Sequence, residues 1–207
     1  MISSSFKNTR EFLEYCKPHI KGKVLDLGAG TAKYRDIIKN TAVSYVAFDK
    51  FPGPNIDVVG DIHETGLTSG SFNTIICTQV LEHVPVPWLA AKEIKRLLDN
   101  DGICIVTTPF MQASHADPHD FYRFTTDGIA QIFLMEGFEI VEKGAYGKTW
   151  SVLFDLIKLL RFNPYHRPRR GTWTLVQWSM RVADFLDRFT TNEIIYGSSY
   201  AIVKKVS

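Results

Sequence analysis

Short, almost continuously apolar segments alternate with helix-like segments over most of this 207-residue chain. Residues 74–77 and 103–106 are two of these segments, and neither contains a charged side chain. Such runs are typical of strands that are buried on both faces, and strands that alternate with helices usually pair in parallel. The alternation therefore predicts an α/β fold, in which helices cover both faces of a mainly parallel sheet.

The same pattern places the individual elements. Strands are expected at about residues 23–27, 43–48, 55–59, 72–77, 102–107, 137–141 and 199–204. Helices are expected at about residues 5–20, from the residues after Thr31 to about residue 39, and at about 88–98 and 126–135. We expect one domain over residues 1–207, with a helical insertion at residues 148–192 before the last strand.

The composition excludes several classes of protein. Hydrophobic residues make up 45% of the chain, too many for a disordered protein. The net charge of +2 gives no general reason to bind nucleic acid. The three cysteines lack zinc-ligand spacing, and Cys77 and Cys104 lie inside apolar runs, so we expect reduced core residues. The N-terminal residues have no apolar signal core, and no apolar run approaches about 18 residues, so we expect a cytoplasmic protein.

Ligands of open α/β sheets bind beyond the carboxyl ends of the strands, so we examined the residues there. The first strand ends in Asp26-Leu-Gly28-Ala-Gly30, whose glycines allow the backbone to approach a ligand. A dinucleotide-binding loop has a third glycine where this chain has Lys33, which argues against a nicotinamide oxidoreductase. A carboxylate directly before the glycines suits a ligand that carries a positive charge. Asp49, after the second strand, is placed to accept hydrogen bonds from ribose hydroxyls.

Six segments, in order over about residues 20–145, resemble the class I S-adenosylmethionine-dependent methyltransferases, and among them the ubiquinone-biosynthesis-like group. The segments are Val24–Thr31, Val46–Asp49, Gly60–Ile62, Phe72–Cys77, Val80–Val84 and Leu97–Gly102. The resemblance implies S-adenosylmethionine as cofactor and a Rossmann-like sheet of seven strands, with an antiparallel last strand.

The resemblance also implies roles for matched residues. Asp26 and the glycine loop would face the methionine part of the cofactor, Asp49 the ribose, and Asp61 with Ile62 the adenine. The implied cofactor-binding set is Asp26, Gly28, Ala29, Gly30, Asp49, Lys50, Asp61, Ile62 and Gln79. Each strand-end Asp has an alternative interpretation as a helix cap or turn former, and Asp57 competes with Asp61. Glu82 could simply cap the following turn, so the set omits it.

The acceptor side is expected at His83 and in the polar run from Ser114 to Phe124. The candidate catalytic residues are His83, His115, His119 and Tyr122. Asp120 and Arg123 have two interpretations, a catalytic role or a structural ion pair that caps the next helix. Similar runs occur in bacterial relatives of the family, some tied to glycan or secondary-metabolite pathways, which points to a small-molecule or glycan-like acceptor.

A metal site is the alternative for the same polar run. His115, Asp117, His119 and Asp120 carry suitable ligand atoms. Their short spacing, with Pro118 among them, does not favour a preformed site, and we predict none. A nucleic-acid acceptor is disfavoured because the fourth strand is followed by Thr-Gln-Val, without the Pro-rich motif of base-directed relatives.

The predicted insertion is rich in Trp and has two apolar, helix-like stretches, at about residues 150–162 and 172–189. It could pack on the sheet, cover an apolar acceptor, form a homodimer surface, or contact a membrane peripherally. Residues 156–170 carry five basic side chains and no acid, which leaves the rest of the chain mildly acidic. An anionic or lipophilic acceptor therefore stays open. So does a protein that binds S-adenosylmethionine without catalysis and uses the insertion for interaction.

Overall fold

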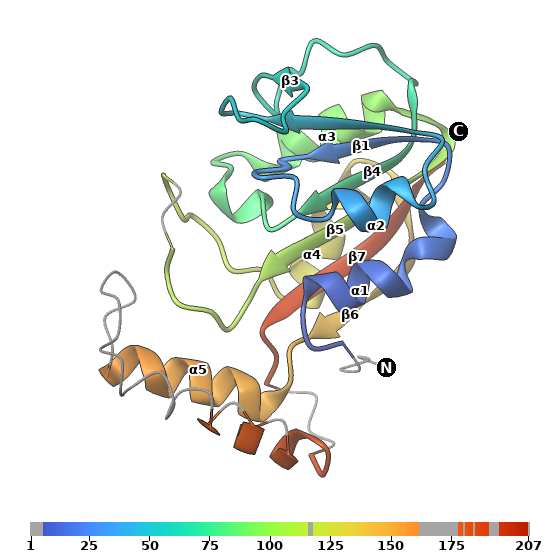
Figure 1. Cartoon of the computed structure of the whole chain (residues 1–207). Coiled ribbons are helices and arrows are strands. Elements are labelled where there is room, and N and C mark those ends of the chain that lie inside the picture. Colours follow the sequence, from blue (N-terminus) through green and yellow to red (C-terminus); the bar gives the residue numbers. More distant parts are fainter. Residues whose placement is uncertain are drawn as a thin grey trace.

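The structure is a computed structural model of the chain, and it describes residues 6–115, 118–161, 178–179, 181–183, 185–190 and 195–206. One sheet of seven strands, in the order β3-β2-β1-β4-β5-β7-β6, forms its centre (Figure 1). The strands are β1 (Lys23–Leu27), β2 (Ser44–Asp49), β3 (Val58–Val59), β4 (Phe72–Thr78), β5 (Leu98–Pro109), β6 (Phe138–Tyr146) and β7 (Ser198–Lys205).

The pairing of the strands confirms the predicted fold class. The strands from β3 to β5 pair in parallel. Among the seven strands, β7 alone runs antiparallel, and it pairs with β5 on one side and β6 on the other. The carboxyl ends of all the parallel strands therefore lie at one edge of the sheet, where a ligand site is expected.

Helices cover both faces of the sheet. They are α1 (Thr9–Tyr15), α2 (Arg35–Lys39), α3 (Pro87–Leu97), α4 (Thr126–Met135) and α5 (Thr149–Arg161), with short 3-10 helices η1 (Lys17–His19) and η2 (Leu81–His83). On one face, Phe12 of α1 and Ile37 of α2 pack in a buried cluster with Ile105. On the other face, Ile94 of α3 and Phe133 of α4 pack with Cys104 (Figure 1). Neighbouring residues of β5 thus point into opposite layers, as two-sided burial predicts.

Three elements differ from the sequence prediction. Strand β5 begins at Leu98 rather than at residue 102, because Leu98 already pairs with Phe72 of β4; the register then shifts before Ile103 pairs with Thr74. Strand β3 contains only Val58 and Val59 of the predicted residues 55–59. The first helix is divided into α1 and η1, since Pro18 lacks the backbone N–H that would continue the α-helix.

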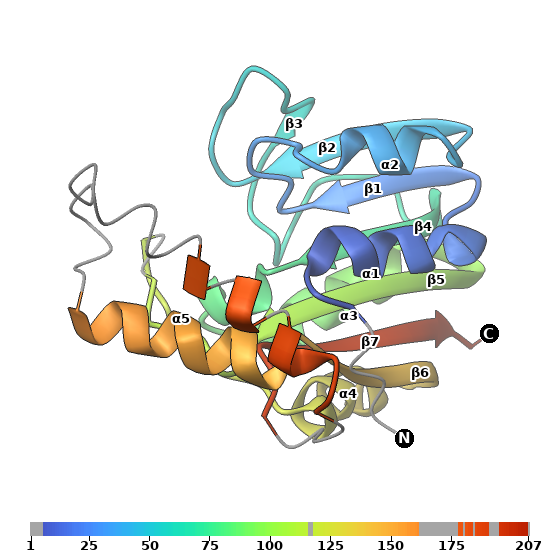
Figure 2. The same cartoon turned by 60° about the horizontal axis from the view of Figure 1, so that its bottom comes forward.

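The predicted insertion at residues 148–192 is described in part. Its first helix, α5, extends past the carboxyl end of β5 (Figures 1 and 2). Asp187 fixes the start of α5, because its carboxylate accepts hydrogen bonds from the N–H of Trp150 (2.8 Å) and of Ser151 (3.1 Å). The indole N–H of Trp150 donates to Thr190 (2.8 Å). Residues 172–177 of the predicted second helix lie outside the described residues.

Two further expectations concern the cysteines and the membrane. All three cysteines are buried free thiols, and burial raises the pKa of each. Cys77 and Cys104 are thus the reduced core residues that the sequence predicted. Within the described residues, no helix has both the length and the apolar character needed to span a bilayer.

Candidate active site

A cavity of about 400 Å³ opens at the carboxyl ends of β1, β2 and β4. It brings together most of the predicted cofactor-binding set, namely Gly28, Gly30, Asp49, Lys50, Asp61, Ile62 and Gln79. Asp26 and Ala29 do not line it. Of the catalytic candidates, His83 and His119 line the cavity, whereas His115 and Tyr122 do not.

The glycine loop passes so close to its neighbours that position 28 has room only for glycine. Gly28 has a φ of +79°, and a Cβ atom there would lie 2.4 Å from Cγ2 of Val80. The N–H groups of Gly28 and Ala29 both donate to the carbonyl of Phe48, at 2.9 and 3.0 Å. Gly30 also has a positive φ, +58°, but faces open space. The loop is therefore pinned between β2 and the segment after β4.

Asp49 joins the glycine loop to the end of β2. Its Oδ2 accepts the N–H of Gly30 at 2.8 Å, and its Oδ1 accepts the N–H of Phe51 at 3.0 Å. These bonds fix the orientation of the carboxylate, and each oxygen keeps a free lone pair for a further donor. Asp49 is thus preorganised to receive two hydroxyl groups from the cavity.

Asp61 and His63 form the opposite wall of the cavity. The N–H of His63 donates to Oδ1 of Asp61 at 2.8 Å and holds the pKa of Asp61 below its usual range. Nδ1 of His63 lies 2.7 Å from the same oxygen. The other ring nitrogen, Nε2, is buried and has no hydrogen-bond partner within the described part of the chain. Sequence reasoning missed His63, although its position two residues after Asp61 was the available signal.

Gln79 stands at the end of β4 in an unusual backbone conformation. Its φ is +56°, in the left-handed region that non-glycine residues seldom occupy. Its N–H donates to the carbonyl of Thr107 at 2.8 Å, and its side-chain amide donates to the Thr107 hydroxyl at 3.1 Å. Such strain, of the order of 1–3 kcal/mol, is typical of functional sites. Here it turns the chain from β4 into the cavity wall.

Comparison with known proteins identifies the family. The profile of a family described as a methyltransferase domain matches residues 4–175, most of the chain. The chain belongs to the class I S-adenosylmethionine-dependent methyltransferases. None of the curated proteins matches the sequence.

Solved structures share the fold of this methyltransferase at low sequence identity. An S-adenosylmethionine-dependent methyltransferase from Archaeoglobus fulgidus has a TM-score of 0.62 and 15% identity, over 96% of this chain and 95% of its own. The (4+2)-cyclase SpnF has a TM-score of 0.64 and 14% identity, over 99% of this chain and 84% of its own. A Burkholderia thailandensis 1,6-didemethyltoxoflavin-N1-methyltransferase, solved with S-adenosylhomocysteine, has a TM-score of 0.61 and 12% identity, over 96% and 80%.

The cofactor of this methyltransferase is S-adenosylmethionine. The cavity fits it on two observations. Asp49 has lone pairs left for ribose hydroxyls, and the orphaned Nε2 of His63 offers a buried polar partner for a base. The carboxylates beside the glycine loop also suit a ligand that carries a sulfonium and an ammonium group.

Asp26 supplies a further acidic group next to the cavity. It is 2% exposed, and its Oδ2 accepts the hydroxyl of Tyr45 at 2.7 Å. Burial raises the pKa of Asp26 to about 6, against the effect of the Tyr45 hydrogen bond. Because Asp26 does not line the cavity, its predicted contact with the cofactor ammonium stays a prediction.

A second group of lining residues comes from the chain after Gln79, where the sequence predicted the acceptor side. His83 of η2 lines the cavity together with Pro85, and Pro118, His119 and Phe121 come from the segment after β5. The ring of His119 packs against Phe121, with centroids 5.4 Å apart. This part of the cavity therefore combines imidazole nitrogens with an apolar wall.

Two side-chain contacts fix the segment after β5. Arg123 forms a paired contact with both oxygens of Asp120 and also donates to the carbonyl of Ala113 at 3.1 Å. The hydroxyl of Tyr122 donates to the carbonyl of Pro85 at 2.9 Å. The start of α4 is capped by Thr125 instead, so the Asp120–Arg123 ion pair holds the loop rather than the helix. Asp117 lies outside the described residues.

Proposed function

We propose that the protein transfers the methyl group of S-adenosylmethionine to a small-molecule or glycan-like acceptor. The observation that carries the proposal is the continuity of the cavity. The same cavity that contains Asp49 and Asp61 extends past Gln79 to His83 and His119. One space thus offers a cofactor end with carboxylates and an acceptor end with imidazoles.

The chain's residues have three tasks in such a reaction. Bound S-adenosylmethionine supplies a methyl group, whose bond to sulfur breaks as a bond to the acceptor forms, leaving a neutral thioether. The cavity walls hold the two molecules in line, which is the main source of rate enhancement for this displacement. An imidazole that lines the cavity accepts the proton that a hydroxyl or ammonium acceptor loses, and His119 keeps this task if His83 is engaged elsewhere. His115 and Tyr122 do not line the cavity, so they would act through these neighbours.

The lining of the acceptor end favours a small, partly apolar molecule. Phe121, Pro85 and Pro118 supply apolar surface, and two histidines supply polar contacts. An anionic acceptor stays a prediction, because residues 162–170 of the basic segment lie outside the described part of the chain.

The test is turnover with a panel of acceptors. Purified protein is incubated with S-adenosylmethionine and small phenols, hydroxy acids or amino sugars, and S-adenosylhomocysteine is measured by mass spectrometry. We expect product above the enzyme-free rate with at least one acceptor class, and none with Asp49→Ala. Tight cofactor binding without product across the panel would contradict the proposal.

A second candidate is a cofactor-binding protein that acts through its insertion. The described part of the insertion exposes three aromatic side chains, Trp178 (66%), Phe185 (56%) and Phe189 (72%). Exposed aromatics of this kind are typical of interaction surfaces. Light scattering and vesicle co-sedimentation of the wild type and of Phe185→Ser/Phe189→Ser would test it. A wild-type protein that is monomeric and does not sediment with vesicles would contradict this candidate.

A further inference from the structure

Glu82 is a buried carboxyl group that the cofactor site does not use. Its side chain is 0% exposed, and neither carboxylate oxygen has a hydrogen-bond partner within the described residues. Buried polar groups are almost always hydrogen-bonded, and an unpaired buried carboxylate is strongly unfavourable, so this group calls for a partner that the described residues do not supply.

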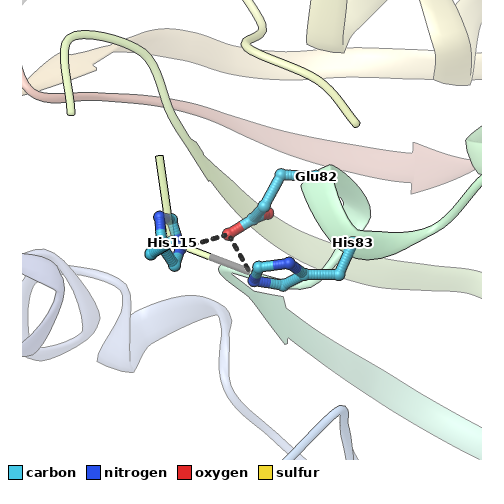
Figure 3. Close-up of side chains that lie close together, drawn as sticks. All are labelled: Glu82, His83 and His115. Carbon is cyan, nitrogen blue, oxygen red and sulfur yellow. Dashed lines mark ion pairs between the residues drawn. The ribbon is translucent and has the colours of Figure 1, made fainter. Parts of the chain in front are cut away.

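Two imidazole rings face this carboxylate (Figure 3). Nε2 of His83 lies 3.6 Å from Oε1 of Glu82, and Nε2 of His115 lies 3.9 Å from the same oxygen. The two rings are nearly perpendicular, with centroids 5.0 Å apart. One ligand atom from each of the three residues lies within 4.8 Å of the others, so three donor atoms converge on one point.

In each imidazole ring, the hydrogen bond made by Nδ1 determines whether Nε2 carries a proton or a lone pair. Nδ1 of His83 lies 2.5 Å from the carbonyl of His119, and Nδ1 of His115 lies 3.2 Å from the carbonyl of Ala113. Since a carbonyl only accepts hydrogen bonds, each Nδ1 carries the proton. In a neutral ring, Nε2 then presents a lone pair toward Glu82. This is the arrangement by which proteins orient metal-binding histidines.

The nearby charged groups do not neutralise Glu82. The guanidinium of Arg123 is paired with Asp120 and with the carbonyl of Ala113. Asp120 in turn accepts the N–H of His115 at 2.9 Å. This ion pair therefore holds the loop that carries His115 in place, and the guanidinium makes its direct contacts with Asp120 rather than with Glu82.

The distances from Glu82 to the two rings distinguish a shared proton from a shared metal ion. A direct O–H···N hydrogen bond between Glu82 and either ring would require about 2.7 Å, much less than the 3.6 and 3.9 Å observed. Two ligands on one metal ion, each with a bond of about 2.1 Å, lie about 3.4 Å apart in tetrahedral geometry. The observed separations are close to the second value.

We propose that Glu82, His83 and His115 form a binding site for one divalent first-row transition-metal ion, such as Zn²⁺ or Co²⁺. Two imidazole nitrogens and one carboxylate favour these ions over Mg²⁺ and Ca²⁺, which prefer oxygen ligands. Three protein ligands leave at least one coordination position open. The chain comes to this site from two places, η2 after β4 and the loop after β5 (Figure 3).

The open coordination position gives the metal ion a catalytic role. This role, unlike the binding of the ion, rests on the proposed methyltransferase function. His83 lines the acceptor end of the cavity, so the ion lies beside that end. A metal-bound hydroxyl group loses its proton far more readily than a free one. The acceptor class is then a molecule whose oxygen can bind the metal ion, such as a phenol, a catechol or a hydroxy acid.

The first experiment tests metal binding alone. Metal-free protein is titrated with Co²⁺, and the visible d–d absorption and stoichiometry are recorded, followed by competition with Zn²⁺. We expect one ion per chain, and at least a 100-fold weaker affinity in Glu82→Gln and in His115→Ala. His19→Ala, a histidine of η1 far from the trio, is the matched control and should bind like the wild type. A wild type that binds no ion, or variants that bind as tightly as it does, would overturn the site.

The second experiment separates the metal from the cofactor. His115→Ala is the critical variant, because that side chain is 44% exposed and does not line the cofactor cavity. We expect it to bind S-adenosylmethionine like the wild type while it loses Co²⁺ absorption and most of its turnover. Turnover that survives both chelation and His115→Ala would overturn the catalytic role of the ion. Failure of the wild type to bind S-adenosylmethionine would instead contradict the proposed function and leave the metal titration intact.

Discussion

Asp49 lines the cavity and Glu82 lies buried beside His83, which also lines it, and the surroundings of the two carboxylates differ sharply. Asp49 receives a backbone N–H on each carboxylate oxygen, at 2.8 and 3.0 Å. Glu82 receives none from the described residues and is fully buried. The carboxylate at the proposed cofactor end is therefore held before any ligand binds, whereas the one beside the proposed acceptor end has no partner among the described residues.

This difference suggests how the two ends divide their tasks. Backbone donors come from strands and loops fixed by the sheet, so the cofactor end can be shared by proteins with different acceptors. The acceptor end depends on side chains from a loop, which is the part most free to vary. Four substitutions test the contrast, from the largest expected effect to the smallest.

Asp49→Ala should weaken S-adenosylmethionine binding by at least about 100-fold. It removes two hydrogen bonds to a charged group, each contributing about 1.5–3 kcal/mol, and releases the N–H groups of Gly30 and Phe51. Isothermal titration calorimetry measures the affinity. Asp36→Ala, on an exposed ion pair with Arg10, is the control and should bind normally. An affinity within threefold of the wild type in Asp49→Ala would remove Asp49 from the ribose site.

Gly28→Ala should lower the free energy of unfolding by about 2–4 kcal/mol. The new methyl group would lie 2.4 Å from Val80, and φ at this position is positive. Gly70→Ala is a matched control, since Gly70 has a φ of +63° but a methyl group added there would meet none of the described residues within 4 Å. Urea unfolding of both variants separates the clash from the backbone strain. Equal losses in the two variants would show that Val80 moves aside.

Asp26→Asn should stabilise the protein in a pH-dependent way. The folded-state pKa of Asp26 is raised to about 6. Burial of its charge therefore lowers the free energy of unfolding of the wild type, and this loss grows as the pH rises from about 4 to 6. The gain from Asn should be near zero below pH 4 and reach about 2–3 kcal/mol above pH 6. Thermal unfolding across this range measures it. A gain that does not change with pH would mean that Tyr45, rather than the buried charge, determines the effect.

Tyr122→Phe should have the smallest effect, about 1 kcal/mol or less, since it removes one hydrogen bond to the carbonyl of Pro85. We expect faster hydrogen exchange in the loop after β5 and normal cofactor affinity. Tyr15→Phe, which removes an exposed contact with Glu142, is the matched control. Unchanged exchange in the loop would show that the Asp120–Arg123 pair alone holds it.

The sheet and the cofactor end could be predicted because their signals are local. Continuous apolar runs identify strands buried on both faces, and a carboxylate at a strand end keeps its place whatever the rest of the chain does. Strand β5 shows where this fails, since the exposed polar residues that follow Leu98, its first residue, interrupt the apolar signal. His63 was missed for a similar reason, because one histidine in a loop has no pattern around it.

The Glu82–His83–His115 trio could not be predicted from spacing. Glu82 reads locally as a turn residue in η2, and His115 belongs to a separate loop. They meet because the loop is held on itself by Asp120 and Arg123 and is joined to η2 by the hydrogen bond from the N–H of Phe121 to the carbonyl of Glu82 (2.8 Å). Such a fold depends on several side chains acting together, which a pattern along the chain does not record.

Backbone hydrogen bonds join the two ends of the segment between β6 and β7. The N–H of Gly197 donates to the carbonyls of Tyr146 (3.0 Å) and Gly147 (3.3 Å), so the chain returns to the place it left. A Cβ on Gly147 would lie 3.0 Å from the nitrogen of Gly197. Residues 148–196 are thus a detachable module in topological terms. The topology would therefore allow that stretch to change in length without altering the register between β6 and β7.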